Sequence, residues 1–151
     1  MFRQQRIYTL RKLSKEAQRA YGLRILVTRH WLRGIKACEI DFWLPDAGPS
    51  LLLLAAYRSG EVSEQEFLAW YEIEQRGSST CRVVQYKEGK RTPDLCFLVS
   101  PIVYLRQLEE NYGTVTLLCW EEEPDLCHRH HLLMLCEQGT KAISAFNSWS
   151  C

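Results

Sequence analysis

The feature of this sequence that most constrains its fold is the apolar run Thr114 to Cys119, in which valine, threonine and leucine follow one another. Such a run is typical of a strand buried on both faces, and strands of this kind occur in parallel sheets that helices cover. A helix is predicted to begin shortly afterwards, near Cys127. Its predicted buried residues are Leu132, Leu133, Leu135 and Cys136. The residues from Lys141 to Cys151 receive no structural assignment.

Earlier segments predict further strands. Leu23 to Thr28 is a short β-branched and apolar run that follows a glycine, which indicates a second buried strand. A strand is also expected over Arg6 to Thr9, followed by a polar helix over Ser14 to Ala20. The segment Glu39 to Ser50 contains two prolines and a glycine, so an ordered loop without a regular element is expected there.

Three helices are predicted from their start signals. Ser50 is expected to cap a helix over Leu51 to Ser59. Ser63 and Glu66 have the spacing of a capping box, so a second helix should run to about Arg76. Its expected apolar face comprises Phe67, Trp70, Tyr71 and Ile73. Pro101 opens a third helix, with Val103, Leu105 and Leu108 inward, that ends near Asn111 and Gly113.

Two alternating apolar segments, Thr80 to Tyr86 and Leu95 to Val99, flank a charged stretch and predict a β-hairpin. Strands that alternate with helices predict an α/β fold: a three-layer domain with a mainly parallel sheet flanked by helices, plus the inserted hairpin around residues 80–99. One domain over residues 1–151 is expected, with its core at about 6–138 and a tail at 139–151.

Composition limits the classes of function. The 151 residues carry a formal charge of +1, so no global field favours nucleic acid or an anionic membrane. No segment has the apolar length of a membrane span or the pattern of a secretory signal. Seven cysteines without regular spacing suit a reduced protein better than a disulfide framework. A cytoplasmic location is expected.

Reactive side chains cluster where the strand at Thr114 to Cys119 ends. If the strand at Leu23 to Thr28 is its neighbour, the loop Arg29 to Gly34 lies at the same carboxyl edge, where open α/β sheets bind ligands. The candidate catalytic residues are Glu121, Cys127 and His128. The candidate ligand-binding residues are Arg29, Arg33, Ser50, Tyr57, Cys119 and Arg129.

Each candidate has a chemical reason and an alternative. A cysteine at a helix N-terminus is partly thiolate, and arginine offers a planar donor fork that suits phosphate or carboxylate. Alternation along the strand places Cys119 and Glu121 on one side, with Trp120 on the other, so Glu121 is the general-base candidate. The alternative is structural: Cys127 is a residue of the helix cap, His128 a surface group, and Arg129 an ion-pair partner of Glu121.

Metal binding is a further alternative, because several thiol and imidazole groups occur within thirteen residues. They are Cys119, Cys127, His128, His130 and His131. There is no C-x-x-C pair, and adjacent histidines on a helix point about 100° apart, so the spacing is not that of a zinc finger. No metal ligand set and no cofactor is assigned. Walker, dinucleotide-binding, serine-hydrolase and zinc-protease motifs are absent from the sequence.

Several short motifs carry a resemblance to a known family. They are Thr28-Arg29 with Arg33-Gly34, Gly48-Pro49-Ser50, Tyr57-Arg-Ser-Gly60, Glu66-Phe67 with Tyr71, and Leu117-Leu-Cys-Trp-Glu121 with Cys127-His-Arg129. Together they resemble the YeaO-like family, domain of unknown function 488, over most of Leu23 to Leu135. The resemblance implies a compact cytoplasmic α/β domain and assigns no activity. Ser78 to Ser100 is longer than the family's usual link between helices.

Three hypotheses about function follow. The first is an enzyme acting on an anionic ligand such as a nucleotide or a nucleic-acid component, with Glu121 or His128 moving a proton. The second is a non-catalytic regulatory module that binds a small ligand, a metal or nucleic acid. The third is a protein-interaction module that uses the hairpin. No membrane partner is expected, and the sequence leaves the oligomeric state open.

Overall fold

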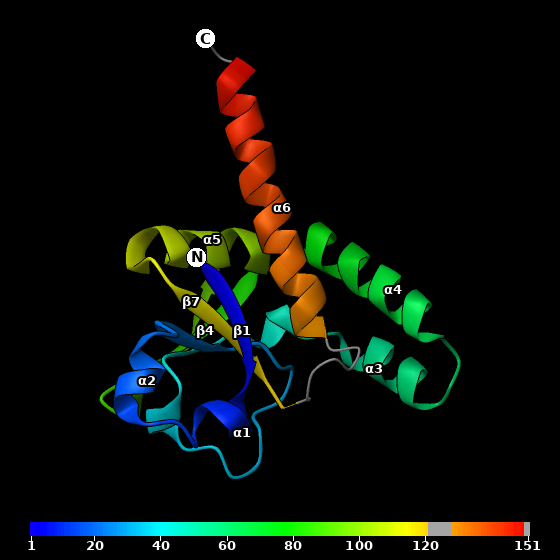
Figure 1. Cartoon of the computed structure of the whole chain (residues 1–151). Helices are drawn as coiled ribbons and strands as arrows, with labels where there is room; N and C mark the ends of the chain where they lie inside the picture. Colours follow the sequence, from blue (N-terminus) through cyan, green and yellow to red (C-terminus); the bar gives the residue numbers. More distant parts are fainter. Residues whose placement is uncertain (121–127, 150–151) are drawn as a thin grey trace.

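The computed structural model describes residues 1–120 and 128–149, with side chains described for 1–120 and 128–138. Within these residues the chain forms a seven-stranded sheet in the order β1-β7-β2-β3-β4-β5, with β6 also paired to β4 (Figure 1). The strands are β1 (Phe2–Arg6), β2 (Leu23–Leu26), β3 (Phe42–Trp43), β4 (Cys81–Lys87), β5 (Lys90–Arg91), β6 (Leu95–Phe97) and β7 (Val115–Cys119).

The sheet is parallel through β1, β7, β2 and β3, and antiparallel from β3 to β4 and onward to β5 and β6. Strands β2 and β7 are hydrogen-bonded neighbours, with Leu26 opposite Leu118. The predicted α/β class with a mainly parallel sheet is therefore confirmed, and so is the expected adjacency of these two strands. The predicted hairpin is confirmed as well, and its strand β4 joins the main sheet through β3.

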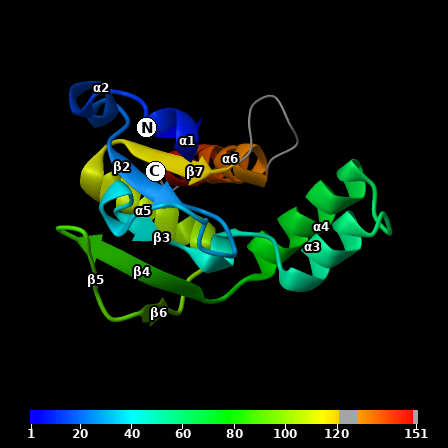
Figure 2. The same ribbon diagram turned by 90° about the horizontal axis from the view of Figure 1, so that it is seen from below.

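Helices lie on both faces of the sheet (Figures 1 and 2). They are α1 (Ile7–Leu10), α2 (Lys15–Arg19), α3 (Leu51–Arg58), α4 (Glu64–Gly77), α5 (Pro101–Tyr112) and α6 (His128–Trp149), with 3-10 turns at Ala37–Glu39 and Pro45–Ala47. Serine side chains at 14, 50, 63 and 100 each accept a hydrogen bond from the first turn of the helix that follows. The predicted helix starts at Ser50, Ser63 and Pro101 are thus confirmed.

The two faces of the sheet belong to two apolar clusters. Val115 and Leu117 pack in the larger cluster, with residues of α3, α4, α5 and α6, while Leu118 packs in the smaller cluster with Ile7 and Leu10 of α1. Successive strand residues point to opposite faces, so every residue of β7 is buried. This double burial is the reason that its sequence is apolar without interruption.

The structure corrects the predicted strand at Arg6 to Thr9. Strand β1 ends at Arg6, and Ile7 begins the one-turn helix α1. β1 lies at the edge of the sheet, where it pairs with β7 through its backbone while its side chains stay mostly half-buried, so its sequence is polar. Ile7 and Leu10 lie three residues apart on one face of α1, and both point into the smaller cluster.

Other expectations need smaller corrections. The segment expected to be irregular contains the two-residue strand β3, which pairs with both β2 and β4. On α4, Phe67 and Tyr71 are buried as predicted, but Trp70 and Ile73 are exposed. Val103 on α5 is exposed too. The backbone from Lys141 to Trp149, which received no assignment from the sequence, continues α6.

A glycine allows β2 to start beside β7. Gly22 has a φ of +66°, and a Cβ atom placed there would lie 2.3 Å from the carbonyl oxygen of Thr114. Only glycine fits such a close approach in this conformation.

Among the described residues, no helix is long and apolar enough to cross a membrane. Cys38 and Cys96 are exposed free thiols, and Cys81 is a buried one.

Candidate functional site

The carboxyl ends of the parallel strands meet at one edge of the sheet, as the sequence predicted. Because β2 and β7 are parallel neighbours, the loop after β2 and Trp120, which follows β7, leave the sheet at the same edge. A pocket of about 760 Å³ opens there. It is lined by Arg6, Thr28, Arg29, His30, Leu32, Pro49, Leu54, Tyr57, Arg58, Glu64, Phe67, Trp120 and His128. We call it the carboxyl-edge pocket.

Arg29 fastens one wall of the carboxyl-edge pocket. Its Nε donates to the carbonyl of Pro49 at 3.0 Å, its Nη2 donates to the carbonyl of Gly48 at 2.9 Å, and its Nη1 pairs with Asp46 at 3.0 Å. A Cβ atom at Gly48 would lie 2.4 Å from the backbone nitrogen of Arg29, so the two segments touch through their backbones. Arg29 therefore has a structural role here, although it also lines the pocket.

Helix α4 holds the same loop from the other side. The Tyr71 hydroxyl donates to the carbonyl of Ala47 at 2.6 Å, and Gln75 Nε2 donates to the carbonyl of Asp46 at 3.0 Å. A carboxylate oxygen of Glu74 accepts from the backbone nitrogen of Ser50 at 3.0 Å. Carbonyls of a buried irregular segment need such partners. The loop Pro45 to Ser50 is thus bonded on both sides.

His128 lies at the inner end of the carboxyl-edge pocket and is only 7% exposed, so it is not a surface group. Its Nε2 lies 2.7 Å from the carbonyl oxygen of Val27. A carbonyl only accepts, so Nε2 carries the proton and Nδ1 is the basic nitrogen. Burial lowers the pKa of His128 to about 4, and the nearby charges of Arg129 and Arg29 act in the same direction. The imidazole is therefore neutral near pH 7.

Beneath the pocket, Arg129 and Cys119 contact each other, and the side chains of both are completely buried. The Nη1 atom of Arg129 donates to the sulfur of Cys119 at 3.1 Å, and its Nε donates to Gln4 Oε1 at 2.8 Å. Cys119 points toward α6 because it shares a face of β7 with Leu117.

The other candidate site residues lie in different places. Tyr57 lines the carboxyl-edge pocket. Ser50 caps α3 and lines a neighbouring cavity of about 400 Å³, together with Arg29, Asp46 and Glu74. Arg33 is exposed and lies outside both cavities. Glu121 and Cys127 lie outside the described residues.

Among the lining residues that were not candidates from the sequence, four could contact a ligand through a charged or aromatic group: Arg6, His30, Arg58 and Trp120. Arg6 ends β1, and its Nε donates to the carbonyl of Trp120 at 2.8 Å. Trp120 is 52% exposed, which is unusual for a tryptophan next to a buried strand. The alternation along β7 was a usable signal, because it placed Trp120 opposite Cys119. Arg6 and Arg58 come from distant segments and carried no local signal.

The three described histidines of α6 have three different partners. His128 bonds Val27, His130 bonds Gln4, and His131 lies 3.2 Å from a carboxylate oxygen of Glu72. Within residues 1–120 and the described side chains of α6, no three histidine, cysteine or acidic side chains gather as metal ligands do. The described residues therefore provide no zinc set, and Cys127 lies outside them.

A three-layer α/β protein with a pocket at the carboxyl ends of its parallel strands is the class that this geometry defines. The family model DUF488-N3a, described as the active DUF488-N3 subclade, matches residues 7–139. The chain therefore belongs to the DUF488 family, and the resemblance seen in its motifs is confirmed. No curated protein and no solved structure matches the chain.

Proposed function

We propose that this protein is an enzyme that acts on an anionic ligand of the nucleotide class, bound in the carboxyl-edge pocket. One observation carries the proposal: three arginines and an exposed tryptophan line one pocket at the edge where parallel strands end. Open α/β folds bind their ligands at this edge. The description of the matched family as an active subclade agrees with an enzyme.

The charge of the pocket supports an anionic ligand. Arg6, Arg29 and Arg58 line it, and Glu64 is the acidic residue among the described lining residues. Carbonyl oxygens orient both Arg6 and Arg29, and Arg29 also forms an ion pair with Asp46 that offsets part of its charge. A fixed guanidinium suits phosphate, because its planar fork matches two oxygens at once.

The aromatic residues support a ligand with a ring. Trp120 and Tyr57 both line the pocket, and Trp120 is half exposed there. Stacking of a base on an aromatic side chain contributes about 1–3 kcal/mol in single-strand binders. A phosphate near the arginines and a base on Trp120 would use both features of the pocket.

The proton-transfer step is assigned to His128 or Glu121. His128 supports the assignment because it is neutral near pH 7 and lies at the inner end of the pocket. Glu121 as general base and Cys127 as a thiol nucleophile remain predictions, since both lie outside the described residues. Cys119 and Arg129 act beneath the pocket in this proposal, where Arg129 holds the sulfur and Gln4 in place.

The test combines binding with turnover. Adenosine, guanosine, cytidine and uridine monophosphates are titrated against tryptophan fluorescence, and the same mixtures are followed by NMR for conversion. Arg58→Gln should weaken binding about tenfold, as expected for the loss of one charged contact. Arg33→Gln is the matched control, because this exposed arginine lies outside the pocket. Unchanged binding in Arg58→Gln would contradict the proposal.

His128→Gln separates an enzyme from a non-catalytic module. A glutamine amide can still donate to the carbonyl of Val27, but it has no basic nitrogen. An enzyme that uses His128 keeps its affinity and loses turnover in this variant. Glu121→Gln is the parallel test of the other candidate base. Binding without conversion in the unmodified protein would replace the enzyme with a ligand-binding regulatory module.

The hairpin supports a second candidate function, a protein-interaction module. Leu95 and Leu98 are 52% and 86% exposed, and they stand on or next to strand β6. Exposed apolar side chains that lie close together are common at protein-binding surfaces. Replacing both leucines by serine should then abolish partner binding and leave the nucleotide titrations unchanged.

A further inference from the structure

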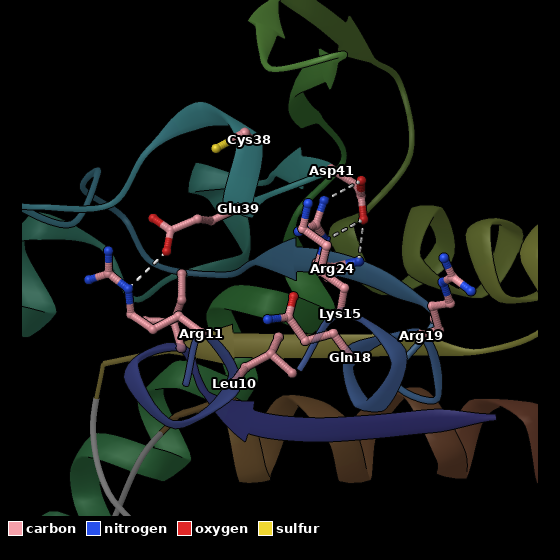
Figure 3. A pocket seen from close by; sticks show the side chains of 11 residues that line it. Leu10, Arg11, Lys15, Gln18, Arg19, Arg24, Cys38, Glu39 and Asp41 are labelled. Carbon is pink, nitrogen blue, oxygen red and sulfur yellow. Dashed lines mark hydrogen bonds and ion pairs between the residues drawn. The ribbon is translucent and has the colours of Figure 1, made fainter. Parts of the chain in front are cut away.

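A third cavity, of about 550 Å³, lies beside α1 and α2, on the face of the sheet opposite to α6 (Figure 3). It is lined by residues of α1 and α2, of the start of β2 and of the turn at Ala37–Glu39, together with Asp41. We call it the α2 pocket. Arg24 stands at the start of β2, whereas Thr28 and Arg29 of the carboxyl-edge pocket follow the end of that strand. The two pockets therefore lie at opposite ends of β2.

Two of the arginines in the α2 pocket are neutralised by carboxylates. Arg11 pairs with Glu39 at 2.8 Å. Arg24 makes a two-point contact with Asp41, with its Nε and its Nη2 each 3.1 Å from a carboxylate oxygen. Figure 3 shows these two pairs on the wall of the cavity. They fix the wall and add no net charge to it.

Lys15 and Arg19 supply the charge that remains. They are four residues apart on α2, so they share one face of this helix. Both line the pocket, and within residues 1–120 and the described part of α6 no carboxylate forms an ion pair with either of them. Like charges at this spacing destabilise a helix, and an anion between them would remove the repulsion. The pocket thus keeps a net charge of about two, taking the ordinary charge of each side chain.

The inner wall of the pocket is apolar. Ile7 and Leu10 line it, and both belong to the smaller apolar cluster. Both side chains are almost completely buried, so they form the floor of the cavity and offer little free surface. A bare inorganic anion would leave most of a cavity of about 550 Å³ unfilled. A phosphate monoester would fill more of it, because the phosphate carries a charge of about −1.5 to −2 near pH 7 and the organic body occupies the remaining volume.

We propose that the α2 pocket binds a small phosphate monoester, with the phosphate between Lys15 and Arg19 and the organic body over Ile7 and Leu10. A nucleic-acid backbone is the less suitable ligand, because it tracks along a groove whereas these residues surround a cavity. The inference does not depend on the carboxyl-edge pocket, since the two pockets share no lining residue.

The structure provides a local probe for this site. Cys38 is exposed and lines the α2 pocket, so a ligand in the pocket should shield its thiol (Figure 3). The experiment measures the rate of Cys38 alkylation by iodoacetamide at fixed ionic strength, by peptide mass spectrometry, with phenyl phosphate as the probe. Phenol and inorganic phosphate are the comparison compounds. Cys96, which is exposed outside the pocket, is the internal reference thiol.

Phenyl phosphate should slow alkylation of Cys38 about tenfold at ten times its dissociation constant, and leave Cys96 unchanged. Inorganic phosphate should protect more weakly, and phenol not at all. Protection should disappear in Lys15→Gln/Arg19→Gln. The control Lys12→Gln/Lys87→Gln removes the same charge from exposed positions outside the pocket and should stay protected. Arg58→Gln should also stay protected, so failure here is distinguishable from failure at the carboxyl-edge pocket.

Three outcomes would overturn the proposal. The first is no protection of Cys38 in the unmodified protein at millimolar phenyl phosphate. The second is equal protection in the Lys15→Gln/Arg19→Gln variant, which would place the anion elsewhere. The third is protection by a short single-stranded RNA but not by phenyl phosphate, which would assign the surface to nucleic acid.

Discussion

The two pockets at the ends of β2 hold their charged groups in different ways. At the carboxyl edge, Arg129 has no exposed surface and His128 almost none, although the Arg29–Asp46 pair there is 25% and 29% exposed. In the α2 pocket, Arg24 and Asp41 pair at the surface, with 24% and 30% of their side chains exposed. Removing a partner of a buried charge is strongly destabilising, because the charge has no water to replace the lost contact. Removing a partner of an exposed charge costs little, because water replaces it. Substitutions should therefore cost far more stability at the carboxyl edge.

The largest effect is expected at Arg129. Arg129→Ala should lower the free energy of unfolding by about 3–5 kcal/mol, because it leaves a cavity and removes the donor to Gln4 from a buried place. Urea denaturation at constant pH measures this loss. Arg33→Ala, at an exposed loop position, is the control and should change stability by less than about 0.5 kcal/mol. Equal effects in the two variants would remove the difference in burial as the explanation.

The second effect concerns pH. The pKa of His128 is lowered from 6.5 to about 4 in the folded protein, so the unfolded chain binds a proton first as the pH falls. The contribution of His128 is complete above pH 6.5 and is lost as the pH falls toward 4, by about 3 kcal/mol at 1.36 kcal/mol for each pH unit.

Urea denaturation between pH 7.5 and 4 measures this loss, and His128→Gln should have a flatter profile than the unmodified protein. His30→Gln removes an exposed histidine of the same pocket and should leave the profile unchanged. Parallel profiles for the unmodified protein and His128→Gln would mean that His128 is not held in its neutral form.

The third effect concerns the contact between two backbones. Gly48→Ala should destabilise the protein by about 1–3 kcal/mol, because the new Cβ would overlap the backbone of Arg29 and overpacked sites relax only in part. Thermal unfolding measures it. Gly77→Ala is the matched control, since its Cβ would meet no atom within 4 Å. A Gly48→Ala protein as stable as Gly77→Ala would show that the loop can move away from β2.

The smallest effect is expected in the α2 pocket. Asp41→Asn should lower stability by about 1 kcal/mol or less, because ion pairs at the surface contribute little. A double-mutant cycle with Arg24→Gln measures the coupling between the two side chains, and it should also stay below about 1 kcal/mol. A coupling above about 2 kcal/mol would make the two ends of β2 alike and would end the contrast drawn between them.

The sequence predicts best where a local rule decides the structure. The unbroken apolar run of β7 and the capping box at Ser63 both appear as expected, because each depends on neighbours a few residues away. The sequence predicts poorly where pairing with a distant strand decides the structure. The edge strand β1 is polar and is held by its pairing with β7, and β3 is two residues long and exists only because β2 and β4 lie on either side of it.

The same distinction applies to the candidate site. The position of His128 and Arg129 at the start of a helix after a buried strand was readable, and so was the convergence of two loops. The role of Arg29 was not readable, since its partners lie some twenty residues further along the chain. The place of Trp120 in the pocket was not readable either, because its carbonyl accepts a hydrogen bond from Arg6, which is far away in the sequence.

The loop Pro45 to Ser50 is bonded by Arg29 on one side and by three side chains of α4 on the other. Its conformation is irregular, yet it is fastened like a regular element. Irregular segments usually exchange their amide hydrogens quickly, because they open without unfolding anything else. In this protein the amide of Ser50, bonded to Glu74, should open only when α4 does. The amide hydrogens in this wall of the carboxyl-edge pocket should therefore exchange as slowly as those of α4.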